Sequence, residues 1–95
     1  MPDLKRLVLD VLKPHIPSIV ELSKRLSALP GVVGVNCALE EVDQETESIT
    51  VTIEGTSINY DAVIETIKEC GAVIHSVDSV STGKKLIMKG AEDQD

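Results

Sequence analysis

The chain of 95 residues has no Phe and no Trp, and Tyr60 is its single aromatic residue. Proteins that bind single-stranded nucleic acid stack the bases on aromatic side chains, and this chain lacks such a set. Basic residues are also few: nine Lys and Arg stand against 16 Asp and Glu, for a net charge of -7. Because phosphate backbones are bound by basic surfaces, the composition argues against nucleic acid as a partner.

Cysteine is scarce as well, since Cys37 and Cys70 lie far apart and form no CxxC pair. This spacing argues against a zinc knuckle, a thioredoxin-like motif and a disulfide framework, and it predicts two buried thiols. No apolar run reaches about 18 residues, and no signal-peptide core follows the charged start of the chain. We therefore expect a cytoplasmic protein that contacts no membrane.

Val, Ile and Leu must build the core, which suits short strands packed under amphipathic helices. The segment from Leu4 to Lys13 alternates with period two, which is typical of a strand. Both of its faces are partly apolar, as expected for a strand in the middle of a sheet. One face carries Leu7, Leu9 and Val11, and the other carries Arg6, Val8, Asp10 and Leu12.

The remaining elements follow from capping signals and alternation. A capping box of Ser18 and Glu21 starts one helix, which Pro30-Gly31 ends, and Asn59 starts a second helix, which ends at Gly71. Residues 32–42 and 48–54 alternate as two strands of a hairpin, the first with Val33, Val35, Cys37 and Leu39 on one face. Residues 72–80 form a fourth strand in which two sets compete for the inward face: Val73, His75 and Val77, or Ile74, Ser76 and Val80. Residues 84–89 are a candidate fifth strand.

The order βαββαβ predicts the α+β class and a ferredoxin-like sandwich. We expect a four-stranded antiparallel sheet of order 4-1-3-2, with both helices on one face. The prediction is a single domain over residues 1–89 and a disordered acidic tail over residues 90–95. This topology brings the end of the first strand, the loop at His15, the acidic hairpin and Cys70-Gly71 to one pole of the molecule.

Four segments, LVLDVLKPHIPSIVEL, LPGVVGVN, EVDQETESITVTIEG and GAVIHSVDSVSTGK, resemble the uncharacterised archaeal family known as domain of unknown function 211. The resemblance runs from about Leu4 to Lys85. It implies a ferredoxin-like fold, a cytoplasmic archaeal protein and ring-like homo-oligomers, and it supplies no established activity. The chain is more weakly similar to heavy-metal-associated domains, but Pro14-His15-Ile16-Pro17 stands where they carry CxxC, so their copper chemistry does not carry over.

The pole of the molecule where the acidic hairpin lies is the candidate site. The carboxylate oxygens of the acidic hairpin are ligands that suit hard cations such as calcium or magnesium. Each residue also has a structural interpretation: a solvated turn for the hairpin acids, a hydrogen-bonded plug for His15 and an ion pair with a Lys or Arg for Asp10. His15 is also a candidate general base, and His75 has the same ambiguity. The predicted metal ligands are Asp10, His15, Glu40, Asp43 and Glu45.

An apolar patch on the sheet face away from the helices predicts self-association, because such patches rarely stay exposed. The segment Leu86-Ile87-Met88 can add to the sheet edge of a neighbouring copy, giving a head-to-tail contact that closes into a ring. The predicted interface residues are Val8, Leu12, Ala38, Val42, Leu86 and Met88.

Motifs of catalysis are missing, since the chain has no Ser-His-Asp order, nucleophile elbow, phosphate loop or metalloenzyme helix motif. The sequence therefore favours an oligomeric binding or regulatory module whose ligand is a divalent cation or a small metabolite. A ring-forming scaffold without a ligand is the alternative, and an enzyme is the third interpretation.

Overall fold

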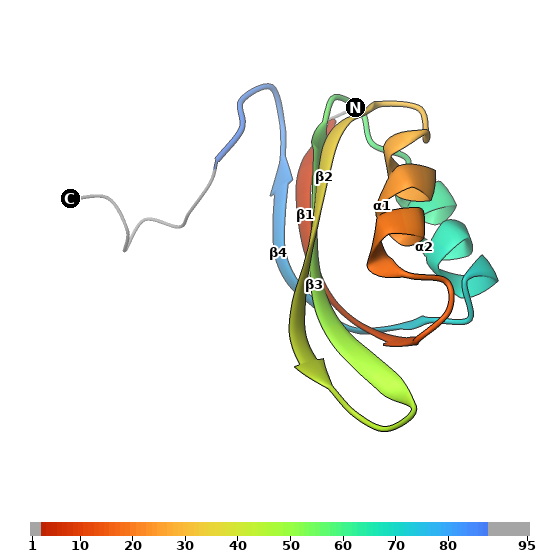
Figure 1. Ribbon diagram of the computed structural model, residues 1–95. Coiled ribbons are helices and arrows are strands. Elements are labelled where there is room, and N and C mark those ends of the chain that lie inside the picture. Colours follow the sequence, from red (N-terminus) through yellow and green to blue (C-terminus); the bar gives the residue numbers. More distant parts are fainter. Residues whose placement is uncertain (1–2, 88–95) are drawn as a thin grey trace.

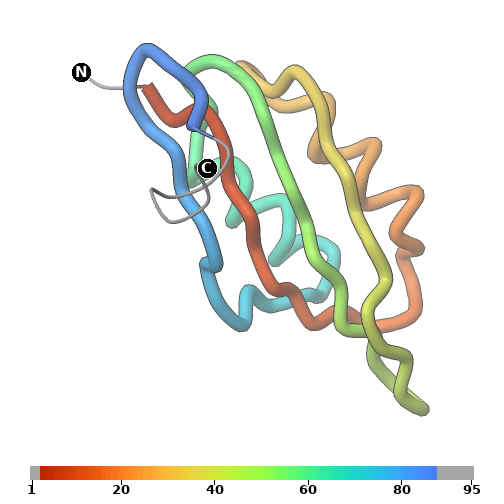
Figure 2. The backbone as a smooth tube through the Cα atoms, turned by 90° about the vertical axis from the view of Figure 1, so that its left-hand side faces the viewer, coloured from red at the N-terminus to blue at the C-terminus, as the bar shows by residue number. Residues whose placement is uncertain are grey.

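The computed structural model describes residues 3–87. Its elements are, in order, β1 (Leu4–Pro14), α1 (Ile19–Ser27), β2 (Val32–Val42), β3 (Thr46–Gly55), α2 (Tyr60–Glu69) and β4 (Val73–Thr82). The four strands form one antiparallel sheet of order β2-β3-β1-β4, which is the predicted order read from its other edge. Both helices cover the same face (Figure 1), and the tube view shows β1 between β3 and β4 (Figure 2). The ferredoxin-like fold is confirmed.

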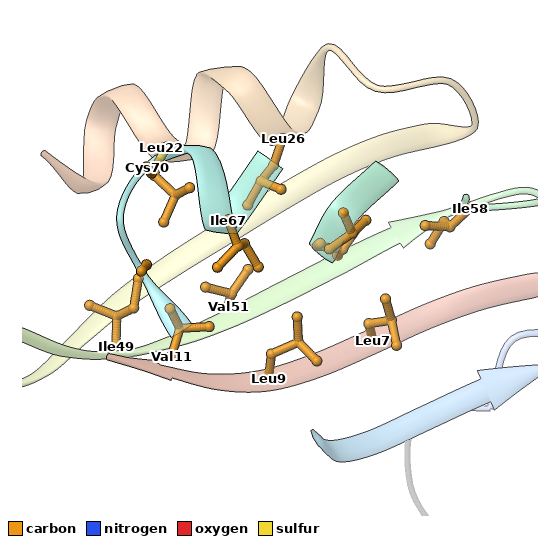
Figure 3. Close-up of a cluster of buried hydrophobic side chains, with 13 residues drawn as sticks. Leu7, Leu9, Val11, Leu22, Leu26, Ile49, Val51, Ile58, Ile67 and Cys70 are labelled. Carbon is orange, nitrogen blue, oxygen red and sulfur yellow. The ribbon is translucent and has the colours of Figure 1, made fainter. Parts of the chain in front are cut away.

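The core lies between the sheet and the helices (Figure 3). Leu7, Leu9 and Val11 of β1 face the helices, as their alternation predicted, and each is at most 1% exposed. The three inward residues of β3, Ile49, Val51 and Ile53, are fully buried beside them. Leu22 and Leu26 of α1 close the core from above. Aliphatic side chains thus supply the buried cluster apart from Cys70, as expected for a chain without Phe or Trp.

The ends of the helices follow the sequence signals closely. The Ser18 hydroxyl accepts a hydrogen bond from the Glu21 amide (3.2 Å), and the Asn59 side chain accepts one from the Ala62 amide (3.1 Å). At Ser18 only the hydroxyl half of the capping box is formed, because the Glu21 carboxylate accepts a hydrogen bond from Arg25 (2.9 Å) instead of one from the Ser18 amide. Gly71 follows α2 with φ of +74°, a left-handed conformation that suits glycine.

The inward residues of β4 come from both of the residue sets that the sequence left open. Its inward residues are Ile74, Val77 and Val80, which pair with Val11, Leu9 and Leu7. Breaks in register near His75 and Asp78 shift the alternation by one residue each time. Neither set could be correct along the whole strand, because each β-bulge exchanges the two faces.

Two corrections in β2 have the same cause. Val33, predicted to face inward, sits at a break in register between Val32 and Gly34 and is 79% exposed. A second break, between Leu39 and Glu41, places Val42 opposite Glu47. Because Glu47 pairs with the inward-facing Lys13, Val42 lies on the helix side of the sheet and not on the other face.

The chain after β4 turns over the sheet face that the helices leave uncovered. The Ser81 hydroxyl donates a hydrogen bond to the carbonyl of Ile87 (2.5 Å). Residues 84–87 form no strand, so the described part of the predicted fifth strand is a bent connection. Met88 and the predicted acidic tail lie outside the described residues. Within residues 3–87, neither helix is long and apolar enough to span a membrane.

Candidate functional site

The pole predicted to hold the site does bring the His15 loop against the hairpin. Lys13 pairs with Glu47 and Pro14 pairs with Thr46 in the register of β1 and β3. The turn of the β2-β3 hairpin therefore lies beside the loop that follows β1. The hairpin extends past the other strands at this end of the molecule (Figures 1 and 2).

Glu47 is the centre of a polar network at this pole. Its Oε1 accepts a hydrogen bond from Lys13 Nζ at 2.9 Å, and its Oε2 lies 2.9 Å from Nδ1 of His15. Lys13 Nζ also donates to the carbonyl of Pro14 at 2.7 Å. Nε2 of His15 lies 3.0 Å from the carbonyl oxygen of Gln44, in the hairpin turn. One histidine thus joins three segments of the chain.

The electrostatics of the network are set by these contacts. The hydrogen bond to Glu47 is the main cause of a raised pKa at His15, and the Gln44 carbonyl adds to it. Conversely, the hydrogen bonds from His15 and then from Lys13 lower the pKa of Glu47. The side chain of Lys13 is entirely buried, so its charge depends on the Glu47 carboxylate for compensation.

Lys13 and Glu47 are not among the predicted ligands, and their pairing was not predicted. Lys13 occupies the inward row of β1, directly after Leu7, Leu9 and Val11 in the same alternation. Extending the period-two pattern by one more position would have placed a lysine in the core. A buried lysine needs a carboxylate partner, so this pattern is the signal that could have pointed to an acidic residue on the neighbouring strand.

His15 offers no open ring nitrogen in this arrangement, since both nitrogens face oxygen atoms of the protein. The hydrogen-bonded plug is therefore the interpretation of His15 that agrees with the structure. The other predicted ligands do not join it. Glu40 accepts a hydrogen bond from Thr50 (3.1 Å), and Asp43 and Glu45 are exposed in the turn. Among residues 3–87, no three His, Cys, Asp or Glu side chains are grouped so that they could hold a metal ion.

Asp10 lies on the opposite side of the sheet from this network. In the register it stands between Thr50 of β3 and Ser76 of β4, on the face that the helices leave uncovered. We call this the open face. Within the described residues, no Lys or Arg forms an ion pair with Asp10, and its side chain is only partly buried. The strands contribute to the open face mainly Asn36, Ala38, Ser48, Thr50, Thr52, Val8, Asp10, Leu12, Val73, Ser76 and Ser79.

The open face is more polar than the sequence predicted. Thr52 and Ser79 flank Val8, while Ser48 and Val73 flank Leu12. Val42 is absent from this face. Beside Asp10 the face is hollowed into a recess of about 200 Å³. Its lining combines a carboxylate, an imidazole, a hydroxyl and an aliphatic side chain: Asp10, His75, Ser48 and Leu12. The bulge in β4 at His75 places that imidazole next to Asp10.

The two cysteines differ in burial, since Cys37 is partly buried and Cys70 is buried. Burial raises the pKa of the Cys37 thiol to about 11, so the thiol is protonated at neutral pH. Cys70 is 3% exposed and belongs to the core. Both are free thiols.

Comparison with known proteins gives a family without an assigned activity. The sequence profile of domain of unknown function 211, described as an uncharacterised ArCR, matches residues 5–95. An uncharacterised protein of Methanocaldococcus jannaschii, MJ0319, is 43% identical over 95 residues, which cover 100% of this chain and 98% of the relative. The chain therefore belongs to the family of domain of unknown function 211.

Proposed function

We propose that this protein is a homo-oligomeric binding module that assembles into a ring and holds a small ligand at the recess beside Asp10. The ligand class is a hard divalent cation such as calcium or magnesium, or a small polar metabolite. The observation that carries the proposal is the recess itself, which places Asp10 and His75 side by side on a sheet face that no helix covers.

The size of the open face supports self-association. Its strands have 10 or 11 residues each. At about 3.4 Å per residue and about 4.8 Å between strands, four such strands make a surface of roughly 700 Å². A stable protein interface buries about 800 Å² on each partner, so a second copy seated on this face and on the chain after β4 that turns over it would cover an area of that order.

The charges at the two ends of the sheet support a head-to-tail arrangement. Lys84 and Lys85 are exposed in the turn after β4, next to the start of β1. The acidic residues Glu41, Asp43 and Glu45 are exposed at the other end of the strands. Opposite charges at opposite ends favour contact between the basic end of one copy and the acidic end of the next, and repetition of that contact can close a ring.

The chemistry of the recess supports a small polar ligand. The carboxylate of Asp10 can bind a hard cation or accept a hydrogen bond, and the Ser48 hydroxyl can do either. A single copy brings one carboxylate and one imidazole, which is too few for a protein-only calcium site with six to eight oxygen ligands. Waters or groups of a second copy would have to complete the coordination.

The assembly is tested by measuring mass with light scattering at micromolar concentration. We expect the parent protein to be larger than a monomer, and the double variant K84E/K85E to lose mass because it repels the acidic end of its neighbour. The variant K24E/K68E is the matched control, since both lysines are exposed on the helices. A monomeric parent would reject the assembly, and equal loss of mass in both variants would reject the head-to-tail contact through Lys84 and Lys85.

The ligand is tested by calorimetry with calcium and magnesium and by thermal melts with a panel of metabolites. A ligand that prefers the native state raises its stability by mass action. We expect Asp10→Asn to weaken binding at least about tenfold, which corresponds to about 1.4 kcal/mol. Asp61→Asn, at an exposed carboxylate in the first turn of α2, should bind as the parent does. If Asp10→Asn and the parent bind equally well, the ligand does not bind at this recess.

A ring-forming scaffold without a ligand is the second candidate. It is favoured by the lack of any group of three metal-binding side chains among residues 3–87. An oligomeric parent that shows no shift with any compound in the panel would select the scaffold over the binding module.

A further inference from the structure

Both ring nitrogens of His15 face atoms that accept hydrogen bonds. Nε2 lies 3.0 Å from the Gln44 carbonyl oxygen, and a backbone carbonyl can only accept. Nδ1 lies 2.9 Å from Oε2 of Glu47, and an ionised carboxylate can only accept. A neutral imidazole carries one N–H and can satisfy one of these partners. The contacts therefore require the doubly protonated imidazolium.

Glu47 is held in its ionised form by the same network. The buried ammonium of Lys13 donates to Oε1 at 2.9 Å, on the side of the carboxylate away from His15. Protonating Glu47 would leave the Lys13 charge without its partner in a buried position, which is costly. The proton between His15 and Glu47 therefore belongs to the histidine.

We infer that His15 is a pH-sensitive latch that fastens the turn of the β2-β3 hairpin to the loop after β1, and that loss of the imidazolium proton releases the turn. The latch consists of the His15 side chain and its two contacts, to Glu47 and to the Gln44 carbonyl. This inference concerns contacts within one copy of the chain.

The release is local because the remaining contacts do not depend on His15. The single proton of a neutral imidazole stays on Nδ1, beside the ionised Glu47, because a carboxylate is the stronger acceptor. Deprotonation therefore leaves the lone pair of Nε2 facing the Gln44 carbonyl oxygen, and this contact to the turn becomes repulsive. The pair of Lys13 and Glu47 remains, and with it the register of β1 and β3. The turn itself is then held by its own hydrogen bond, from the Asp43 amide to the Thr46 carbonyl (2.8 Å).

The other charged groups around His15 favour the same direction. From the hairpin, Asp43 and Glu45 flank Gln44 with two exposed carboxylates, and Glu47 contacts the ring from β3. Lys13 of β1 is the opposing cation, but its ammonium is bound to the far oxygen of Glu47 and to the Pro14 carbonyl. The raised pKa of His15 agrees with this balance of charges.

The latch is tested by NMR on the intact chain. We expect the His15 ring to titrate above 6.5, and Glu47→Gln to move that titration downward. Relaxation of the Cα carbons, which needs no labile amide proton, reports on the turn. Order parameters at Gln44 and Glu45 should fall from about 0.85 below the midpoint to about 0.6 above it.

Two variants complete the design. His15→Gln should keep the turn mobile at every pH, while its circular dichroism stays that of the folded parent. His75→Gln, which changes the other histidine, should leave the His15 titration and the turn unchanged, and it identifies the His15 signal. A His15 titration at or below 6.5, or order parameters at the turn that do not change with pH in the parent, would overturn the latch.

Discussion

Lys13 is the residue whose role depends most on its neighbours. Its side chain is fully buried at the end of an aliphatic row, and its charge is balanced by Glu47 on the adjacent strand. The aliphatic stem packs as a hydrophobic residue would, while the ammonium reaches two oxygen atoms. Packing and charge therefore both contribute to stability at position 13. Two substitutions, one that removes both and one that removes only the charge, separate the two contributions.

Lys13→Ala should lower the free energy of unfolding by about 2–4 kcal/mol at pH 6, because it leaves a cavity and removes a buried hydrogen-bonded charge. Lys13→Met fills the same space without charge, and the Glu47 side chain, which is 18% exposed, can be hydrated. Lys13→Met should therefore lower the free energy of unfolding by less than half as much as Lys13→Ala. Lys24→Ala, on the exposed face of α1, should stay within about 0.5 kcal/mol of the parent. Urea unfolding measures all three. Equal effects of Ala and Met at position 13 would contradict the packing contribution.

At the scale of elements, turns and caps connect the helices to the four strands of the sheet. Gly31 links α1 to β2 with φ of +85°, and its carbonyl accepts a hydrogen bond from Thr56 (2.8 Å). A Cβ at Gly31 would lie 2.6 Å from the carbonyl oxygens of Thr56 and Ser57. Gly34 is its natural comparison, since a Cβ there would meet nothing within 4 Å.

Gly31→Ala is expected to destabilise the fold by about 1–3 kcal/mol, because alanine is strained at positive φ and its Cβ meets backbone atoms. Gly34→Ala should be neutral or stabilising by up to about 1 kcal/mol, since alanine loses less backbone freedom than glycine on folding. Thermal unfolding of both variants provides the comparison. If Gly31→Ala is as stable as Gly34→Ala, the close approach of the two loops does not constrain position 31.

The start of α1 gives a second prediction for an element. Ser18→Ala removes the acceptor for the Glu21 amide and should cost about 1 kcal/mol. Ser23→Ala is the control inside the same helix, where the hydroxyl donates to the Val20 carbonyl and alanine has the better helix propensity. Urea unfolding should therefore show a loss only for Ser18→Ala. If Ser18→Ala and Ser23→Ala lose stability by similar amounts, the effect belongs to any serine of this helix and not to the cap.

At the scale of the whole molecule, the latch predicts a pH window of stability. The raised pKa of His15 gives a stabilisation that is complete below its ordinary value of 6.5 and is lost as pH rises through the folded-state value. The lowered pKa of Glu47 gives a stabilisation that is complete above 4.5 and is lost as pH falls through the folded-state value. The two contributions overlap between pH 4.5 and 6.5.

We therefore expect the stability difference between the parent and His15→Gln to be largest between pH 4.5 and 6.5 and to shrink on both sides. Urea unfolding at a series of pH values measures it. Lys24→Gln removes one exposed positive charge outside the latch, and its difference from the parent should show no such maximum. A parent and a His15→Gln variant that differ equally at pH 5.5 and pH 9 would contradict the window.

The sequence by itself determined the two helices, the four strands and the order of those strands in the sheet, although it also suggested a strand at residues 84–89 where residues 84–87 form none. Alternation in β1 and β3 indicated their inward residues, because the inward rows of those strands are aliphatic except at Lys13 and Glu47, which pair with each other. The caps at Ser18 and Asn59 are local interactions between residues a few positions apart, so they too can be predicted from the chain alone. The family followed from the same segments.

Tertiary structure decided the faces of β2 and β4 and the contacts of the candidate site. Each β-bulge exchanges the two faces, and it arises from pairing with a neighbouring strand, so no alternation within β4 could reveal it. The grouping of Lys13, His15 and Glu47 joins residues up to 34 positions apart in sequence. The separation of Asp10 from the network of Lys13 and Glu47 has the same origin: strand register places these side chains on opposite faces of the sheet, and register is a property of paired strands.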